Sequence, residues 1–414
     1  MELRKVKLGE IATIVNGATP STTDPCNYDG DIVWITPKDL SDQKSKYIKE
    51  GSRNITQKGF DSCSAQLIPP LNILMSSRAP IGLLAINEVE CCTNQGFKNI
   101  IVDKSICDAD YMFYYLHYHM AEVQALGSGT TFKEVSKSSL ERLSVTLPNL
   151  SVQRRIGKLL SDIDRKIALN RQMNATLEAM ARQLYDYWFL QFDFPDANGK
   201  PYKSSGGKMT WNNKLKRDIP EGWSCGTLLD IAEYTNGLAC QKFRPTSTDR
   251  LPVIKIKEMH EGLSADTEWV KSDIPEAVKV YDGDVLFSWS ASLEVMLWAY
   301  GKGGLNQHIF KVTSKNGYPR SFYYYQLLNY IGVFKRMAEA RKTTMGHITQ
   351  DHLKQSTIAL PPNVDIANRL EEKLCPIFDS IVKNNQEIMY LTRLRTTLLP
   401  LLMNGQVSVK GPAA

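Results

Sequence analysis

The chain has 414 residues, of which 43% are hydrophobic and 23% charged, and its net charge is +6. This composition is typical of a globular protein with two or three domains, and its mildly basic balance permits contact with a polyanion without requiring it. No run of 18 apolar residues exists, and the charged start MELRKVKLGE does not have the form of a secretory signal. We therefore expect a cytoplasmic protein without a membrane span.

The eight cysteines predict neither a disulfide framework nor a metal site. They form no CxxC pair, and the adjacent Cys91 and Cys92 do not have metal-ligand spacing. His117 and His119 lie in the aromatic segment YMFYYLHYHM, where packing is the expected role. Reduced, mostly buried thiols are expected in a cytoplasmic protein.

The most informative pattern is an internal repeat that spans the chain. LGEIATIVNG at 8–17 is matched by LLDIAEYTNG at 228–237, and further matches continue at offsets of 212 to 220 residues. Solenoid repeats have units of about 20–50 residues, so this longer period indicates a duplicated module. Two similar but unequal modules suit a long ligand with two similar but unequal sites.

The first module, residues 1–148, is predicted to combine short strands and turns with some helix. The β-branched runs 31–34 and 99–102 have strand length, and Asn-Gly, Asp-Gly and Pro-Pro pairs mark turns. Residues 110–124 are predicted to form a helix with aromatic side chains on its apolar face. Pro148 ends the globular part.

A long helix is predicted for residues 149–192, with Ser151 as its N-cap. It contains no proline, and at about 1.5 Å per residue it would be roughly 50 Å long or more. One small module cannot cover so long an apolar stripe, so a long partner is required. The polar segment 193–222, rich in Gly, Ser, Asn and Lys, is predicted to be an extended linker loop.

The second module, residues 223–362, repeats the first, and a second long helix is predicted for 363–404. The apolar stripes of the two helices match at an offset of 214, and each is interrupted by one Asn, a residue that fixes register at such positions. The alternative is that each helix packs only on its own module. Pro376 predicts a kink or a break, and Pro400 is expected to end the helix near Leu399. The seam positions are Ile156, Ile163, Asn170, Leu177 and Leu184 in the first helix, and Leu370, Ile377, Asn384, Leu391 and Leu398 in the second.

The sequence lacks the common catalytic signatures. It has no GxxxxGK[ST] loop, no GxGxxG after a strand, no HExxH and no GxSxG. It also has no Asn/Asp-Pro-Pro-Tyr/Phe element of an amino-methyltransferase, and no convincing nuclease core. We therefore expect a non-catalytic chain, without a cofactor or metal of its own.

Both modules carry polar, basic and hydroxyl residues of the types that contact phosphates and base edges. Residues shared by both copies, such as Asn94-Gln95 and Asn306-Gln307, are interpreted as structural, because modules with different targets should differ in the residues that read them. The candidate DNA-binding residues are Lys38, Arg78, Thr130, Thr131, Lys133, Arg244, Lys257, Ser290, Lys302, Lys342, Thr343, Thr344 and His347.

Across almost its whole length the chain resembles the specificity subunits of type I restriction–modification systems. The resemblance is carried by the order module, helix, module, helix, and by GSGTTFKEVSKSSLERLSVTLP at 127–148 running into SVQRRIGKLLSDIDRKI at 151–167. TTMGHITQDHLKQSTIALPP at 343–362 is a degenerate second copy of the first of these. The linker NGKPYKSSGGKM and IPEGW at 219–223 are also similar to that family.

The resemblance implies an α+β fold with two tandem α/β target recognition domains, separated by two long helices that pair as an antiparallel coiled coil with pseudo-two-fold internal repeat. Each domain would read half of a bipartite, asymmetric site in double-stranded DNA, and the helices would set the gap between the halves. Partners would be two methyltransferase subunits, which use S-adenosylmethionine to methylate a flipped adenine, and two endonuclease subunits, which use ATP and Mg²⁺.

Two other classes of protein stay open. A cytoplasmic coiled-coil scaffold would bind proteins and show no sequence-selective DNA binding. A fused restriction or methylation enzyme would require the cofactor motifs that the sequence lacks.

Overall fold

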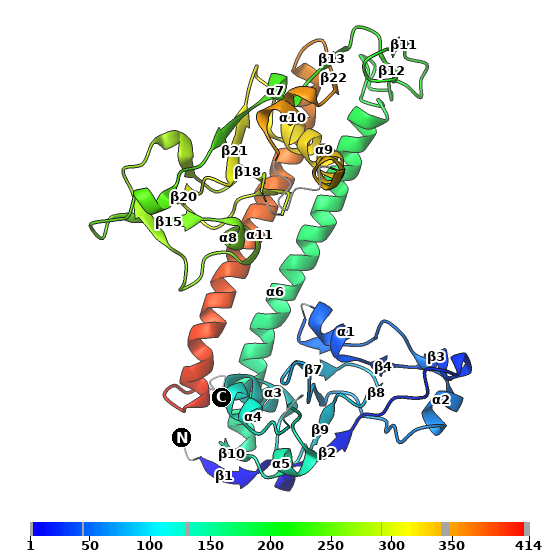
Figure 1. The fold of residues 1–414 in the computed structure, drawn as a ribbon, viewed down its shortest axis with the longest axis vertical. Helices are drawn as coiled ribbons and strands as arrows, with labels where there is room; N and C mark the ends of the chain where they lie inside the picture. Colours follow the sequence, from blue (N-terminus) through cyan, green and yellow to red (C-terminus); the bar gives the residue numbers. More distant parts are fainter. Residues whose placement is uncertain (1–2, 44, 130–132, 291, 341–347, 410–414) are drawn as a thin grey trace. The chain divides into compact units, whose positions relative to one another are not determined.

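The computed structural model describes residues 3–43, 45–129, 133–290, 292–340 and 348–409 and has an α+β fold (Figure 1). The chain forms two compact units. Unit 1 consists of Met1–Leu169 with Tyr390–Ala414, and unit 2 is the continuous segment Asn170–Met389. Each unit therefore contains one globular module and a part of each long helix.

The module of unit 1 is built on a five-stranded sheet with the order β2-β9-β6-β7-β5, in which β5 pairs in parallel with β7 and the other pairs are antiparallel. Two strand pairs flank it, the parallel β4-β8 and the antiparallel β1-β10. The elements are β1 (Arg4–Lys7), η1 (Leu8–Glu10), β2 (Ala12–Asn16), η2 (Pro25–Asn27), β3 (Tyr28–Ile32), β4 (Trp34–Ile35), α1 (Pro37–Asp42), β5 (Tyr47–Ile48), α2 (Gln57–Asp61), β6 (Ile73–Met75), β7 (Leu84–Asn87), β8 (Cys92–Thr93), β9 (Lys98–Val102), α3 (Ala109–Tyr118), α4 (Met120–Ala125), α5 (Lys137–Glu141) and β10 (Ser144–Leu147).

The module of unit 2 has a four-stranded antiparallel sheet, β14-β21-β18-β19, and a second sheet, β16-β15-β20-β17. An antiparallel pair, β13-β22, joins its two ends. The elements are β13 (Ser224–Gly226), α7 (Leu228–Ile231), β14 (Ala232–Asn236), η4 (Cys240–Lys242), β15 (Arg250–Ile254), α8 (Ile256–Glu261), β16 (Trp269–Lys271), η5 (Glu276–Val278), β17 (Lys279–Val280), β18 (Val285–Ser288), β19 (Glu294–Leu297), β20 (Gly303–Leu305), β21 (Ile309–Ser314), α9 (Arg320–Ala340), α10 (Gln350–Gln355) and β22 (Ile358–Leu360).

The repeat predicted from the sequence is present in the pairing of the strands. The order β2-β9-β6-β7 in unit 1 matches β14-β21-β18-β19 in unit 2, and the parallel pair β4-β8 matches β15-β20. The terminal pairs β1-β10 and β13-β22 correspond as well. One difference concerns the aromatic helix, which is single in unit 2 (α9) but is divided at His119 into α3 and α4 in unit 1.

The residue pairs Asn16-Gly17 and Asn236-Gly237 match because both copies need the same close backbone contact. A Cβ on Gly17 would lie 1.8 Å from the carbonyl oxygen of Asn94, and one on Gly237 would lie 2.2 Å from that of Asn306. Glycine is therefore required at both positions. Asn94 and Asn306 form equivalent turns, since their N–H groups donate to the carbonyls of Ile35 and Ile254, both at 3.0 Å. The side-chain oxygens of Asn94 and Asn306 also accept the N–H groups of Gly96 and His308, at 2.9 and 3.4 Å, which confirms the structural interpretation of these two asparagines.

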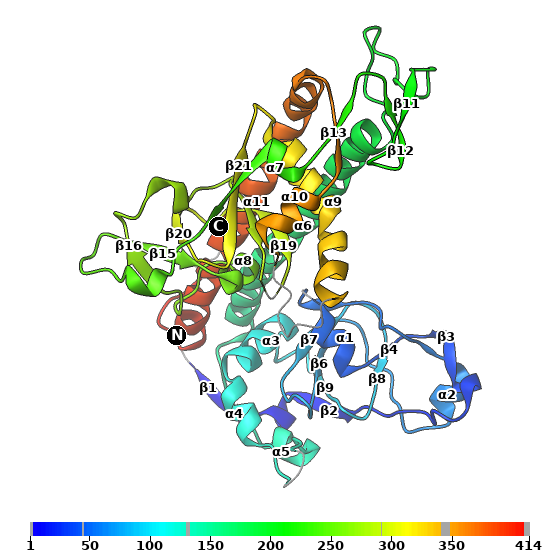
Figure 2. The ribbon, with the colours of Figure 1, turned by 45° about the horizontal axis from the view of Figure 1, so that its top comes forward.

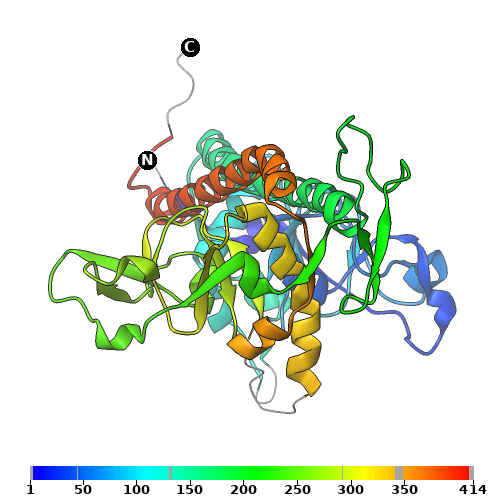
Figure 3. The ribbon, with the colours of Figure 1, turned by 90° about the horizontal axis from the view of Figure 1, so that it is seen from above.

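Two long helices, α6 (Leu150–Tyr185) and α11 (Asp365–Met403), pack side by side in each unit (Figures 1 and 3). Their contacts in unit 2 join Asn170 to Glu387 and Asn174 to Asn385, so the numbering rises along one helix as it falls along the other. The pairing is therefore antiparallel, as predicted. Asn149 rather than Ser151 caps α6, because its Oδ1 accepts the N–H of Val152 at 3.0 Å.

The two prolines of α11 do not break it. Pro376 is exposed and lies within the continuous helix, where Ser380 Oγ donates to the carbonyl of Pro376 at 2.7 Å. The helix also continues through Pro400 to Met403, so the predicted end near Leu399 is wrong. The buried faces of α11 offset the backbone donor that each proline removes, because Leu374, Phe378 and Leu402 are all almost fully buried.

The seam between α6 and α11 contains a network of polar side chains around the two predicted asparagines, Asn170 and Asn384. Asn170 Nδ2 donates to Glu387 Oε2 at 2.7 Å. Asn174 donates to Asn385 Oδ1 at 2.7 Å and accepts from Asn384 Nδ2 at 2.8 Å. Of the predicted seam positions, those that are buried are Ile156, Ile163, Asn170 and Leu370, and those that are partly buried are Leu177, Leu184, Ile377, Asn384, Leu391 and Leu398.

In unit 1, charged side chains join the module to the helix pair. Lys46 Nζ lies 2.5 Å from Asp110 Oδ1 and donates to Ser161 Oγ of α6 at 2.7 Å. Burial lowers the pKa of Lys46, although the charge of Asp110 partly opposes this. Asp164 of α6 accepts from Tyr114 and from Arg395 of α11, each at 2.5 Å. The module and both helices of this unit are thus connected through buried or half-buried charges.

The linker expected to be an extended polar loop is instead folded. It contains the antiparallel hairpin β11 (Met209–Asn212) and β12 (Arg217–Pro220), which lies beside the C-terminal end of α6 (Figure 2). After a π-helical turn, η3 (Asp186–Leu190), the ring of Phe194 stacks on Tyr202 and on Trp223, with centroids 4.8 and 5.4 Å apart. Aromatic residues within the polar sequence therefore hold the linker against unit 2.

None of the helices in the described part of the chain is long and apolar enough to cross a membrane. The eight cysteines are all unpaired thiols. Burial raises the pKa of Cys91, Cys92 and Cys107 to about 12, so these thiols stay protonated at neutral pH.

Candidate nucleic-acid interface

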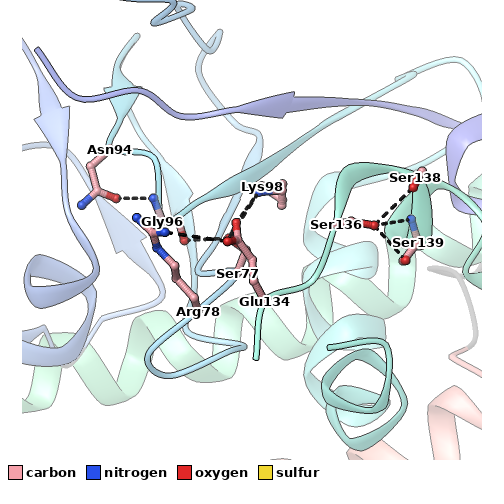
Figure 4. A network of polar contacts seen from close by, with 9 residues as sticks. All are labelled: Ser77, Arg78, Asn94, Gly96, Lys98, Glu134, Ser136, Ser138 and Ser139. Carbon is pink, nitrogen blue, oxygen red and sulfur yellow. Dashed lines mark hydrogen bonds and ion pairs between the residues drawn. The ribbon is translucent and has the colours of Figure 1, made fainter. Parts of the chain in front are cut away.

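A surface turn of unit 1 brings together segments far apart in the sequence. Directly after β6, the N–H of Ser77 donates to the carbonyl of Gly96 at 2.7 Å, and its own carbonyl accepts the N–H of Val135 at 3.0 Å. A Cβ on Gly96 would lie 3.3 Å from Pro37 at the start of α1 and 3.8 Å from Nε of Arg78. The start of α1, the turns at 76–78 and 94–96 and the segment at 133–135 therefore meet (Figure 4).

Charged side chains are concentrated at this meeting point. Glu134 lies between Lys98 Nζ at 3.0 Å and Arg78 Nη1 at 3.7 Å, and Ser77 Oγ donates to its carboxylate at 3.3 Å (Figure 4). Partial burial raises the pKa of Glu134, but the hydrogen bond and charge of Lys98, with the charge of Arg78, outweigh this, so the net pKa is lowered. Glu134 is therefore ionised at neutral pH, and the three charged groups together carry one net positive charge.

Unit 2 makes the corresponding turn with aromatic side chains. The N–H of Trp289 donates to the carbonyl of His308 at 3.3 Å, and its carbonyl accepts the N–H of Ile348 at 3.0 Å. The ring of Trp289 lies 5.7 Å from His308 and 5.8 Å from Phe310, and its Nε1 donates to Asn236 Oδ1 at 3.0 Å. The same backbone connections thus carry a charged group in one module and an aromatic group in the other.

Three candidate residues of the first module are near this turn. Lys38 is exposed in the first turn of α1, Arg78 is half-buried, and Lys133 is exposed beside Glu134. The candidates Thr130 and Thr131 lie outside the described residues, so the structure does not place them.

The candidates of the second module are more dispersed. Lys257 is exposed on α8 and pairs with Asp266 at 3.8 Å, and Lys302 is exposed with its Nζ 5.8 Å from the centre of the Tyr281 ring. Ser290 is buried, and Arg244 is exposed after η4. Outside the described residues are Lys342, Thr343, Thr344 and His347.

Sequence reasoning missed Ser77, Lys98 and Glu134 in the first module and Trp289 and His308 in the second. Lys98 is the first residue of β9 and its side chain is only 8% exposed, an unusual position for a lysine that only a partner explains. That partner is 36 residues away in sequence. A signal did exist, because Ser76-Ser-Arg78 aligns with Ser288-Trp-Ser290 and differs in two of three residues.

Residues 2–179 and 220–389 match the type I restriction modification DNA specificity domain. The chain belongs to this family. It is 29% identical to the type I restriction enzyme MjaIX specificity subunit of Methanocaldococcus jannaschii, in an alignment that covers 99% of this chain and 94% of that protein. It is also 22% identical to the HindI specificity subunit of Haemophilus influenzae, over 67% and 72% of the two chains.

A solved structure supports the fold assigned to this specificity subunit. The S subunit of a type I restriction–modification system from M. genitalium superposes with a TM-score of 0.63 and 13% identity, over 97% of this chain and 96% of that one. At this identity the similarity concerns the fold alone.

Proposed function

We propose that this specificity subunit reads a bipartite, asymmetric site in double-stranded DNA, with one half-site for each module. The supporting observation is that turns with the same two backbone hydrogen bonds carry Ser77, Arg78 and Lys98 in one module and Trp289, Ser290 and Phe310 in the other. Two copies of one scaffold with different side chains would give two half-sites of different sequence. Family membership supplies DNA recognition as the function of such a scaffold.

We further propose that the chain acts through partner subunits in the cytoplasm. Two methyltransferase subunits with S-adenosylmethionine would methylate one adenine in each half-site, and two endonuclease subunits with ATP and Mg²⁺ would cleave unmodified DNA. Docking of proteins on the helices is supported by large apolar side chains that α6 and α11 leave exposed, namely Leu169, Met173, Met180 and Tyr390.

Sequencing of methylated adenines in cells that express the chain with its methyltransferase subunits tests the proposal. The expected result is one motif of two different halves separated by a fixed, unread gap. A complex that methylates no defined motif, or one continuous motif, would contradict bipartite reading.

A salt titration of the same purified complex on duplex DNA gives a second test. Contacts with phosphates make the affinity fall about 10³- to 10⁵-fold between 50 and 200 mM salt if roughly 6–10 phosphates are neutralised. Affinity that stays constant over this range would favour the scaffold alternative, in which the modules bind proteins.

A further inference from the structure

The charged group of the first module consists of the buried Lys98, the half-buried Arg78 and Glu134, which lies between them. Lys98 is nearly fully buried, and its Nζ also lies 3.4 Å from Ser77 Oγ. The Glu134 side chain is 37% exposed and the Arg78 side chain 39% exposed. The backbone of Glu134 is itself fixed, since its N–H and carbonyl are both hydrogen-bonded to Ser128, at 2.9 and 3.1 Å. The backbone and the contacts with Lys98 and Ser77 thus fix the carboxylate beside the guanidinium group of Arg78.

This group is not needed to make the turn. Unit 2 forms both backbone hydrogen bonds of the turn with Phe310 where unit 1 has Lys98, and with Ser290 where unit 1 has Arg78. A buried lysine is costly unless it is paired, and a hydrophobic residue serves the fold at least as well. The charges of unit 1 therefore require an explanation other than folding.

The geometry fits a role for Lys98 and Glu134 in orienting the side chain of Arg78. Its guanidinium group has five N–H donors in a rigid plane, and within the described residues only Nη1 is engaged, by Glu134. Lys98 compensates the carboxylate from the buried side, so Arg78 retains a net positive charge towards solvent. The remaining donors of this group, on Nε and Nη2, suit a ligand with two adjacent acceptors.

In the major groove, that ligand is guanine, whose O6 and N7 accept from one arginine in a bidentate contact. We propose that Arg78 reads a guanine in the half-site of the first module, and that Glu134, fixed by Lys98 and Ser77, is the positioning residue for its guanidinium group. This assignment rests on the proposed function. It makes Lys98 and Glu134 determinants of specificity although Lys98 is buried.

The test compares methylation motifs of complexes that carry Arg78→Lys, Glu134→Gln or the unchanged chain. Arg78→Lys keeps the charge but removes the fork, so discrimination against other bases should fall roughly 10-fold or more at one guanine of one half-site. Glu134→Gln should relax the same position to a smaller extent. The other half-site should not change in either variant.

Two controls separate positioning from folding. Arg53→Lys alters an exposed arginine of the same module, paired with Asp29 at 3.1 Å, and should leave the motif intact. Glu134→Gln leaves the buried Lys98 without its ion pair, which could unfold the module by itself. The double variant Lys98→Met with Glu134→Gln removes both charges together and should show the same loss of specificity at the guanine. In Arg78→Lys, Arg53→Lys and the double variant, the melting temperature and the dependence of binding on salt should match those of the unchanged complex.

The assignment is overturned if Arg78→Lys leaves the motif unchanged, or if the relaxed position is not a guanine. In the charge-removing variant Arg78→Gln, a uniform loss over all positions, with the slope of log affinity against log salt reduced by about one, would show that Arg78 contacts a phosphate instead. If the unchanged complex yields no methylated motif, the proposed function fails and this assignment with it. A normal wild-type motif with an unaffected Arg78→Lys motif defeats the assignment alone.

Discussion

Units 1 and 2 share the strand order of the central sheet but use different side-chain chemistry at equivalent places. Unit 1 uses charges, as Lys98 with Glu134 at the surface turn and Asp164 with Arg395 at the helix pair show. Unit 2 uses rings, as Trp289 with His308 at the turn and Phe378, the counterpart of Asp164 at the offset of 214, with Tyr324 at the helix pair show. The comparison teaches that backbone hydrogen bonds and tight glycines define the module, so side chains at these places are free to differ.

Exchange of a module is the strongest test of this independence. Replacing residues 1–148 with those of a related specificity subunit should replace one half of the methylated motif completely and leave the other half and the gap unchanged. The donor has to provide equivalents of Lys46 and Tyr114, because these contact Ser161 and Asp164 of α6. A methylome in which both halves change would show that the modules do not read independently.

Removing the buried cation of unit 1 should destabilise that unit alone. Lys46→Met leaves Asp110 without its ion pair, which should cost about 2–3 kcal/mol, somewhat less than for a fully buried pair because Asp110 is partly exposed. Hydrogen exchange measured by mass spectrometry should show faster exchange in peptides of unit 1, with unit 2 as the internal control. The matched variant Lys58→Met removes an exposed pair with Asp24 and should change little. Equal loosening of both units would show that they unfold together.

The amide network of unit 2 should affect register more than stability. The double variant Asn174→Leu with Asn384→Leu replaces the hydrogen bond between these two residues by an apolar contact. It also removes the hydrogen bond that Asn385 Oδ1 accepts from Asn174, so the net change in unfolding free energy should stay within about 1 kcal/mol. Without these amides, crosslinking of engineered cysteines along α6 and α11 should give products of more than one register. Thr176→Ala, an exposed change on α6, should keep one register. A single register in the double variant would contradict the role given to the asparagines.

The smallest expected effect is the acid sensitivity of the surface turn. The lowered pKa of Glu134 stabilises the folded state above the unfolded pKa of about 4.3, and this contribution is lost as the pH falls through the lower folded value. Glu134→Gln should therefore flatten the loss of stability of unit 1 between about pH 5 and 3, by a few tenths of a kcal/mol because the carboxylate is partly exposed. Thermal melts at several pH values would detect this. An equal flattening in Glu88→Gln, an exposed change in the same module, would refute a specific role.

Periodic and repeated features could be predicted from the sequence. The duplication, the two long helices and the structural role of Asn94 depend on spacing that is visible in one chain, whereas the antiparallel pairing of the helices is implied by the resemblance to the specificity subunits. Contacts between residues that are far apart in the sequence and outside the repeat could not be predicted, since nothing in the sequence links Lys98 to Glu134 or Asn170 to Glu387. The continuity of α11 at Pro376 also depends on packing around it, which overrides the local preference. Of the candidate site, Arg78 could be selected because its counterpart differs, whereas its supporting residues could not.

The division of α11 between the units has a consequence for synthesis. Leu402 and Met403 are buried in the same apolar cluster as Leu8, Tyr111 and Ile156 of unit 1. Unit 2, by contrast, is one continuous segment. The ribosome makes the chain from its N-terminus, so the apolar surface of the first module stays exposed to solvent until residues 390–403 have been synthesised. All residues of unit 2 have been synthesised before that point. The first module made is therefore the last to close, and a chain truncated before residue 390 would expose that surface to chaperones and proteases.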